Sequence, residues 1–367
     1  MQYRLQGHER ARWSVHGSTC QAGSDGKFVI FCGSGSGSIM TSILVRCHAC
    51  LAAVAAILTA SSTLAQSATF PDRPIVIVDP AAAGSGTDFF SRPLAEEMSK
   101  ILNKPVIVEN KPGAGGALAA EFVARAKPDG HTLGLAAVST HAANPAVNKA
   151  LRYDPVKDFA AITLMVTLPS VTVVRADAPI RSLKELVEAA RAAPGKVTFA
   201  GPGIGTAAHV LLEQFSRQAG IRVSYIPYRG SGDMLADLLG GRVDVASDNI
   251  PTLLPHLKEG RLRALVVRDV IRVASLPDVP TYKELGFESV SFPLWFGLVA
   301  PAGTPPDVIR LLNNTAQTAM RTPAFQQRIE AGSARYSPST PEHFQAQIEE
   351  WRDRFRITAE QAGIRTE

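Results

Sequence analysis

The sequence predicts an α/β fold in which mostly parallel sheets are covered by helices. From Phe70 onward, short aliphatic runs alternate with amphipathic stretches, and the runs consist almost entirely of Val, Ile and Leu. Strands that alternate with helices indicate parallel sheets. Such sheets are covered on both faces, which explains strands that are apolar at nearly every position. The expected strands are 75–78, 106–109, 132–136, 161–167, 171–174, 197–200, 223–226, 243–246, 264–267 and 296–300.

Helical periodicity fills many of the stretches between these strands. Apolar residues recur every three or four positions, a spacing that places them on one face of a helix. Beyond Pro306 the chain is expected to be nearly all helical. Thr322 and Thr340 mark helix starts there, because each is followed by Pro, which suits the first helical position. The periodic positions are Phe90, Leu94, Met98 and Leu102, then Leu183, Leu186 and Val187, then Val210, Leu211 and Phe215.

A length of 367 residues suggests about two domains. Because no long linker divides the chain, we expect two α/β lobes that share it, with crossings near Thr167–Val171 and Val290–Trp295. The first lobe then comprises residues 66–167 and 295–367, and the second comprises residues 168–294.

Residues 1–65 are expected to be absent from the mature protein. Arg46 precedes the apolar stretch ACLAAVAAILTA, and small residues up to Ala65 complete the pattern of a signal peptide and its cleavage site. A retained membrane anchor is the less favoured alternative, since the stretch turns polar after Leu58 and a spanning helix needs roughly 20 apolar residues. The residues before Met40 are interpreted as an over-extended start or a tag, with a flexible tail as the alternative.

Cysteine content and charge exclude several function classes. All four cysteines precede Ala65, so the mature chain would lack disulfides, thiol catalysis and cysteine metal sites. Five of the 38 Lys and Arg residues but only two of the 33 acidic residues also precede Gln66, which leaves a net charge of +2. Nucleic-acid binding is not expected, because the basic residues are scattered.

Two glycine-rich loops are the main candidates for a binding site. GSGT at 84–87 and GIGT at 203–206 each follow an expected strand and open an expected helix. Glycine permits close approach of the backbone, and Thr is a good N-cap. Free N–H groups at the positive end of a helix dipole can hold an anion without a cationic side chain. Ordinary tight turns are the alternative for either loop.

Polar residues at the ends of other strands would extend this site. Ser139 and His141 follow one strand and Asp248 another, although capping or turn chemistry is the alternative for His141 and Asp248. Tyr228 could line the cleft, and Arg229 could pair with a ligand carboxylate or remain solvated. The candidate ligand-binding residues are Gly84, Ser85, Gly86, Thr87, Asp88, Ser139, His141, Gly203, Gly205, Thr206, Ala207, His209, Tyr228 and Asp248.

Motifs for cofactors, metals and catalysis are missing. GPGIGT has Thr206 where a dinucleotide fingerprint has its third glycine, no acid follows at the required distance, and KPGAGG at 111–116 misses the spacing. The mature histidines form no metal-binding pair, and there is no G-x-S-x-G elbow. Asp88 could be a catalytic acid, but no second carboxylate is near it, so we expect it to accept N–H bonds. We expect no cofactor and no metal.

Several longer motifs resemble one protein family. The stretches PDRPIVIVDPAAAGSGTD, VIVENKPGAGG, YDPVKDFAAIT, IPYRGSGDMLADLLGGRVDVASDN and WFGLVAPAGTP occur in this order. Together they resemble the extracytoplasmic solute receptors of tripartite tricarboxylate transporters, often called the Bug family. The resemblance extends from about Phe70 to the C-terminus.

The resemblance implies a two-lobed periplasmic binding protein of the type II, Venus-flytrap kind, with a mostly parallel sheet in each lobe. It implies a monomer in a Gram-negative periplasm that hinges shut on a small carboxylate. Candidate ligands are di- or tricarboxylates, acidic amino acids and aromatic acids. The ligand would pass to integral-membrane permease subunits. In the family, two loops hold the carboxylate through N–H groups and ordered waters; they correspond here to Gly84–Asp88 and Gly203–His209.

The chain departs from the family pattern at its first loop, where PAAAGS at 80–85 replaces the common P-F-P-P-G-G. Ala207 stands where Ser or Pro is frequent. These differences weaken any transfer of ligand identity. Two other functions stay open: a ligand-sensing receptor for a signalling partner, and an enzyme that acts on a small carboxylate.

Overall fold

The computed structural model describes residues 13–15, 18–22, 28–29 and 70–364. The first three segments are the strands of a small antiparallel sheet, β1 (Trp13–Val15), β2 (Ser18–Ala22) and β3 (Phe28–Val29). The chain separates into two compact units, Met1–Ser67 and Ala68–Glu367, and the second unit carries the fold described below. The expected signal peptide lies outside the described residues. Among those residues, no helix is long and apolar enough to cross a membrane.

Six strands form the first sheet of the second unit. Across the sheet they are β14 (Arg335–Tyr336), β7 (Phe159–Leu168), β13 (Leu294–Pro301), β6 (Thr132–Ala137), β4 (Ile75–Asp79) and β5 (Val106–Asn110). The strand β4 runs parallel to both β5 and β6. The strand β13 is antiparallel to β6 and β7, and β14 is antiparallel to β7.

Five strands form the second sheet. Across the sheet they are β10 (Ser224–Tyr228), β9 (Thr198–Pro202), β11 (Val245–Asn249), β8 (Ser170–Arg175) and β12 (Leu262–Arg268). The strand β9 runs parallel to β10 and β11, whereas β8 is antiparallel to β11 and β12. Each of the ten expected strands overlaps an observed strand, so the alternating aliphatic runs were assigned correctly.

The α/β fold is confirmed, but the sheets are mixed rather than mostly parallel. The parallel pairs lie within the runs from β4 to β6 and from β9 to β11, where helices link each strand to the next. The strand β7 ends at Leu168 in the first sheet, and β8 begins at Ser170 in the second. The strands β7 and β8 are therefore joined directly, without the crossover helix that parallel neighbours require. Both strands pair antiparallel with their neighbours.

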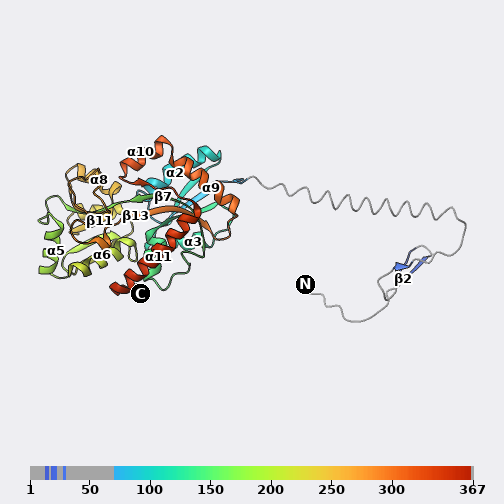
Figure 1. The fold of residues 1–367 in the computed structure, drawn as a ribbon, viewed down its shortest axis with the longest axis horizontal. Coiled ribbons are helices and arrows are strands. Elements are labelled where there is room, and N and C mark those ends of the chain that lie inside the picture. The colour runs from blue at the N-terminus through green and yellow to red at the C-terminus, as the bar shows by residue number, and fades with distance from the viewer. Residues whose placement is uncertain (1–12, 16–17, 23–27, 30–69, 365–367) are drawn as a thin grey trace. The chain divides into compact units, whose positions relative to one another are not determined.

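We call the first sheet with its helices the first lobe. On one face, α2 packs with α9 and α10 around buried residues such as Phe90 and Leu312, and α3 and α11 cover the other face (Figure 1). Thr322 and Thr340 cap their helices by accepting the N–H groups of Phe325 and His343, as expected. The helices are α2 (Asp88–Leu102), α3 (Ala117–Ala124), α4 (Asn144–Val147), α9 (Pro306–Met320), α10 (Pro323–Ala331) and α11 (Pro341–Ala362).

We call the second sheet with its helices the second lobe. Here α5 and α6 cover one face, with Leu186 and Phe215 buried beneath them, and α7 and α8 cover the other face. The helices are α5 (Leu183–Ala192), α6 (Ala207–Ala219), α7 (Ser231–Leu239) and α8 (Ile250–Lys258).

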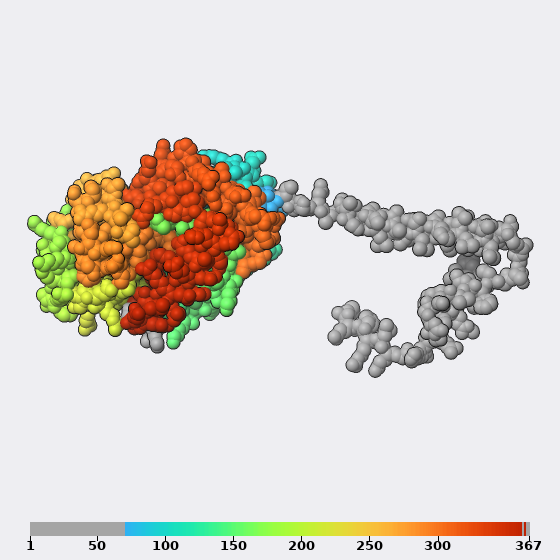
Figure 2. Space-filling model, in the orientation of Figure 1, coloured from blue at the N-terminus to red at the C-terminus, as the bar shows by residue number. Residues whose placement is uncertain are grey.

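An apolar cluster continues from the first lobe into the second. Trp295 of β13 is fully buried and packs edge to face against Phe344 of α11, with ring centroids 5.3 Å apart. The same cluster includes Phe355 near the end of α11 and Phe215 of α6. In Figure 2 the red surface of α11 runs beside the yellow-green second lobe. The lobes are therefore joined by side-chain packing as well as by the chain crossings.

Candidate functional site

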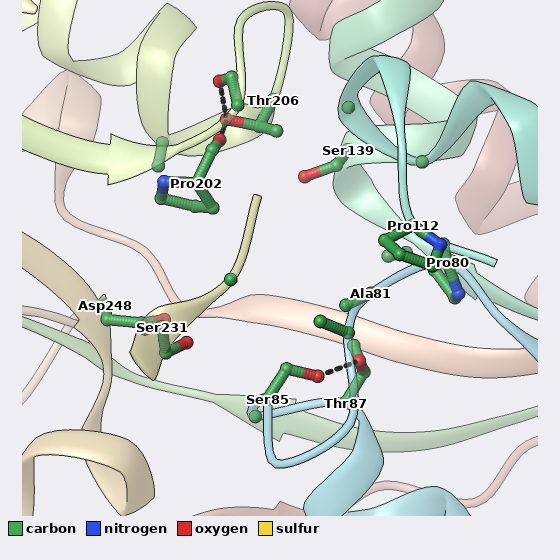
Figure 3. A pocket seen from close by; sticks show the side chains of 18 of the residues that line it. Pro80, Ala81, Ser85, Thr87, Pro112, Ser139, Pro202, Thr206, Ser231 and Asp248 are labelled. Carbon is green, nitrogen blue, oxygen red and sulfur yellow. Dashed lines mark hydrogen bonds between the residues drawn. The ribbon is translucent and has the colours of Figure 1, made fainter. Parts of the chain in front are cut away.

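A cleft of about 420 Å³ lies between the lobes, a volume typical of small-ligand sites. Its walls come mainly from loops at the C-terminal ends of β4, β5, β9 and β11, where ligands bind in open α/β sheets. In Figure 3, Ser85 and Thr87 lie on one side of this space and Thr206 on the opposite side. The expected site residues that line it are Ser85, Gly86, Thr87, Ser139, Gly203, Thr206, Tyr228 and Asp248.

At the start of α2, the side chain of Ser85 rather than that of Thr87 accepts a backbone N–H group. The Ser85 hydroxyl accepts the N–H of Asp88 at 3.3 Å, and the Ser85 carbonyl accepts the N–H of Phe89 at 3.0 Å. The Thr87 hydroxyl instead donates to Asp79 Oδ1 at 2.7 Å. Thr87 occupies the N-cap position as expected, but its side chain makes no capping hydrogen bond, because it donates to a buried carboxylate beneath the loop.

Two backbone N–H groups of the first loop stay free. Within the part of the chain that the structure describes, the N–H groups of Gly86 and Thr87 have no hydrogen-bond acceptor. Both residues line the cleft at the start of α2, a 15-residue helix. The positive end of the helix dipole adds to the attraction of these N–H groups for an anion.

Asp79 stabilises the first glycine-rich loop through hydrogen bonds to its buried carboxylate. Its fully buried carboxylate accepts the N–H of Ala81 at 3.0 Å and the Ser91 hydroxyl at 2.8 Å, in addition to Thr87. Burial raises the pKa of Asp79 from 3.8 to about 6, because desolvation of the charge outweighs these hydrogen bonds. The folded protein therefore retains the Asp79 proton to a higher pH than the unfolded chain does.

Asp79→Asn is expected to remove a pH-dependent part of the stability. Because the folded-state pKa is raised, the Asp79 contribution to the unfolding free energy is complete below about pH 4 and is lost as the pH rises through about 6. The stability of the wild type relative to Asp79→Asn should fall by about 3 kcal/mol between pH 4 and pH 8. Urea unfolding of both proteins across this range measures the difference, and a difference that stays constant would contradict the prediction.

The second loop follows the expected capping pattern. Thr206 is the N-cap of α6, and its side chain accepts the N–H of His209 at 3.4 Å. The N–H of Ala207 is already used, since it donates to Ser139 Oγ of the first lobe at 3.1 Å. The N–H of Thr206 has no acceptor among the described residues. A ligand anion can therefore reach a free N–H group on each lobe.

A third glycine-rich loop, PGAGG at 112–116, also lines the cleft and was missed as a site element. It follows β5 and includes the short helix η2 (Ala114–Gly116). Gly115 has a φ of +64°, and a Cβ there would lie 2.9 Å from the Ile204 carbonyl oxygen in the second lobe. Three glycines shortly after a strand are the sequence signal for this loop, although the stretch misses the spacing of a nucleotide motif.

Three charged side chains are among the described residues that line the cleft: Arg229, Asp248 and Arg268. Arg229 is exposed, whereas Asp248 and Arg268 are buried. Burial raises the pKa of Asp248, and its Oδ1 accepts the N–H of Asn249 at 2.7 Å. Arg268 was not among the expected site residues. A charged residue at the end of an aliphatic strand was the signal that could have identified it.

The family model for the tripartite tricarboxylate transporter family receptor matches residues 90–355. The chain belongs to this receptor family. A relative from Cupriavidus necator, a UPF0065 protein in the gbd 5′ region, is 40% identical over 279 residues, which are 76% of this chain and 84% of the relative.

Solved structures of similar proteins support the same assignment. The periplasmic binding protein BugD is 34% identical, with a TM-score of 0.76 over 81% of this chain and 100% of BugD. MatC from Rhodopseudomonas palustris with bound malate is 32% identical, with a TM-score of 0.75 over 79% of this chain and 99% of MatC. An R. palustris protein with adipate is 29% identical, with a TM-score of 0.77 over 81% and 99% of the two chains.

Six expected site residues of this family member do not line the cleft. His141 is buried against Phe159, and burial lowers its pKa to about 3, so it is neutral at physiological pH. The His209 ring packs on Tyr225, and burial lowers its pKa as well. Asp88 accepts the N–H of Gly84 at 2.9 Å and shapes the first loop. The six are Gly84, Asp88, His141, Gly205, Ala207 and His209.

Tyr228 lines the cleft, but its hydroxyl is engaged elsewhere. It donates to Asp237 Oδ2 at 2.8 Å, and desolvation together with this carboxylate raises the pKa of Tyr228 to about 12. The Tyr228 ring is therefore available to a ligand as a surface rather than as a hydroxyl donor. Among the described residues, no group of three or more His, Cys, Asp or Glu side chains could hold a metal ion.

Proposed function

We propose that this protein is a periplasmic receptor that captures a small carboxylate and delivers it to the permease of a tripartite tricarboxylate transporter. The observation that carries the proposal is the cleft itself, where the free N–H groups of Gly86, Thr87 and Thr206 meet from two lobes. Carboxylate oxygens are the natural acceptors for such groups at helix starts. Similar family structures contain malate and adipate, which are both carboxylates.

We infer that residues 66–167 with 295–367 form one closing body and residues 168–294 form the other. Contacts around the cleft support this division. Ser139 of the first lobe accepts the N–H of Ala207 in the second at 3.1 Å, and a Cβ at Gly230 would lie 3.2 Å from the Ala82 Cβ. Closure of this kind needs only a few hinge residues where the chain crosses between the lobes.

We further propose that the ligand is bound and released unchanged. Among the described cleft residues, Asp248 is the acidic side chain, and the nearby histidines His141 and His209 lie outside the lining. This lining of described residues contains no histidine, the side chain that most often serves as a general base. Incubation of the protein with a bound acid should return that acid intact, and any product would favour the enzyme alternative.

A carboxylate ligand is expected to stabilise the protein against unfolding. A ligand present at 100 times its Kd adds about 2.7 kcal/mol to the unfolding free energy. Thermal-shift measurements of the protein without residues 1–65 should therefore show a raised midpoint with at least one acid from a panel of dicarboxylates, tricarboxylates, acidic amino acids and aromatic acids. Glucose and calcium serve as controls. A shift with glucose or calcium and with none of the acids would contradict the proposal.

A further inference from the structure

Among the residues that the structure describes, Arg268 is a buried cation without an anionic partner. Its side chain is 2% exposed, and its Nε and Nη1 atoms have no hydrogen-bond partner among the described residues. The guanidinium lies 5.4 Å from the centre of the Tyr282 ring, which covers it without accepting a hydrogen bond. A guanidinium stays charged in proteins, and an unpaired buried charge is costly. Arg268 also lines the cleft, so a ligand could supply the missing partner.

A β-bulge directs Arg268 to this position. In the pairing of β12 with β8, Ala264 lies opposite Val173 and Val266 lies opposite Thr172, so Leu265 is an extra residue. Side chains alternate between the two faces of a strand, and an inserted residue reverses the faces beyond it. Without the bulge, Arg268 would share a face with Ala264, which packs on the core beneath α7 and α8. With it, Arg268 lies directly opposite Ser170.

Ser170 provides a second unused polar group at the same place. It is 5% exposed, lines the cleft, and its hydroxyl has no hydrogen-bond partner among the described residues. Ser170 and Arg268 are paired across neighbouring antiparallel strands, so their side chains project from the same face of the sheet. Two buried donors that share a wall of the cleft form a site for an anionic oxygen pair.

We propose that Arg268 and Ser170 bind a second carboxylate of the ligand, and that the receptor therefore selects dicarboxylates over monocarboxylates. This inference rests on the proposed function, because the first carboxylate is held by the free N–H groups of the two glycine-rich loops. The distal carboxylate supplies the charge and the acceptors that Arg268 lacks. Asp248, the acidic residue in the same lining, is buried, and burial raises the pKa of its carboxyl.

Calorimetric titration with acids of matched length tests the inference. Succinate, glutarate and adipate are compared with butyrate, pentanoate and hexanoate, using the wild type and Arg268→Met. The wild type is expected to bind one of the diacids about 100-fold more tightly than the monoacid of the same length, the effect of a hydrogen-bonded charged group. Arg268→Met should lose that preference and keep its affinity for the monoacid. Arg222→Met, which removes an exposed charge outside the cleft, should retain the preference.

Each failure has a distinct meaning. A wild type that binds monoacids and diacids of the same length equally, or an Arg268→Met variant that weakens both to the same extent, overturns the role of Arg268 and leaves the proposed function intact. A wild type that binds none of these six acids overturns this inference, and the proposed function falls with it only if the wider panel of acids also gives no thermal shift.

Stability of the ligand-free protein gives an independent readout. Since Arg268→Met replaces an unpaired buried charge with an apolar side chain of similar length, its urea unfolding midpoint should equal or exceed that of the wild type. A clear fall in the midpoint would mean that the fold itself uses the guanidinium, and would overturn the assignment to the ligand.

Discussion

Arg335→Met is expected to lower the unfolding free energy by about 3 kcal/mol. Arg335 of β14 in the first lobe donates through both Nη atoms to Asp269, at 2.7 and 2.9 Å, and Asp269 follows β12 of the second lobe. Asp269 is fully buried, so removal of Arg335 leaves a buried carboxylate that keeps the N–H of Val270 at 2.6 Å but loses its counter-charge. Because the Arg335 side chain is 39% exposed and water can partly replace it, the loss should fall at the lower end for buried pairs. Urea unfolding measures it.

Lys283→Met is the matched control for this prediction. Lys283 pairs with Glu288 at 2.8 Å, but both side chains are more than half exposed, so the loss should stay below about 1 kcal/mol. The double variant Arg335→Met with Asp269→Asn removes both charges and should recover much of the stability lost by Arg335→Met alone. Equal losses for Arg335→Met and Lys283→Met would show that the buried pair is no stronger than a surface pair.

The fold was largely predictable because local patterns determine its elements. The aliphatic runs located all ten expected strands, and Thr-Pro pairs located the starts of α10 and α11. Strand direction was not predictable in the same way. A run such as 161–167 does not reveal whether the chain reaches the next strand through a crossover helix or passes directly to the other sheet. The antiparallel pairing of β7 with β13 joins segments more than 100 residues apart.

The candidate site was predictable where backbone geometry determines it and less so where burial does. The two G-x-G-T loops were found, since glycine and a capping hydroxyl leave a sequence signature. His141 does not line the cleft, because its ring is buried against Phe159, although its position after a strand suggested a cleft floor. Asp88 accepts the N–H of Gly84, as expected of it, and lies outside the lining. Arg268 was not predicted as a site residue. The face of β12 on which its side chain lies depends on a one-residue bulge at Leu265, which no periodicity in the sequence of the strand reveals.

Gly86→Ala is expected to weaken carboxylate binding at least about 100-fold, the loss of one or two hydrogen bonds to a charged group. Gly86 carries one of the free N–H groups of the first loop and lines the cleft. A Cβ at this position would lie 2.4 Å from Asn249 Nδ2 and 2.9 Å from Asn249 Cβ, across the gap between the lobes. The amide can rotate away, but the Asn249 Cβ is fixed to the backbone at the start of α8. The lobes would then be held apart, and the N–H groups of the two loops could not reach one carboxylate together.

A control and a second-site variant separate this steric effect from a general loss of structure. Gly232 has open space around its Cβ position and lies outside the cleft lining, so Gly232→Ala should bind like the wild type. In the double variant Gly86→Ala with Asn249→Gly, the clash is removed, and glycine at this N-cap costs only a few tenths of a kcal/mol. Its affinity, measured by the same calorimetric titration, should recover at least about 10-fold relative to Gly86→Ala, since closure restores one or more hydrogen bonds to the ligand. A double variant as weak as Gly86→Ala would place the defect in the first loop itself and not in the approach of the two lobes.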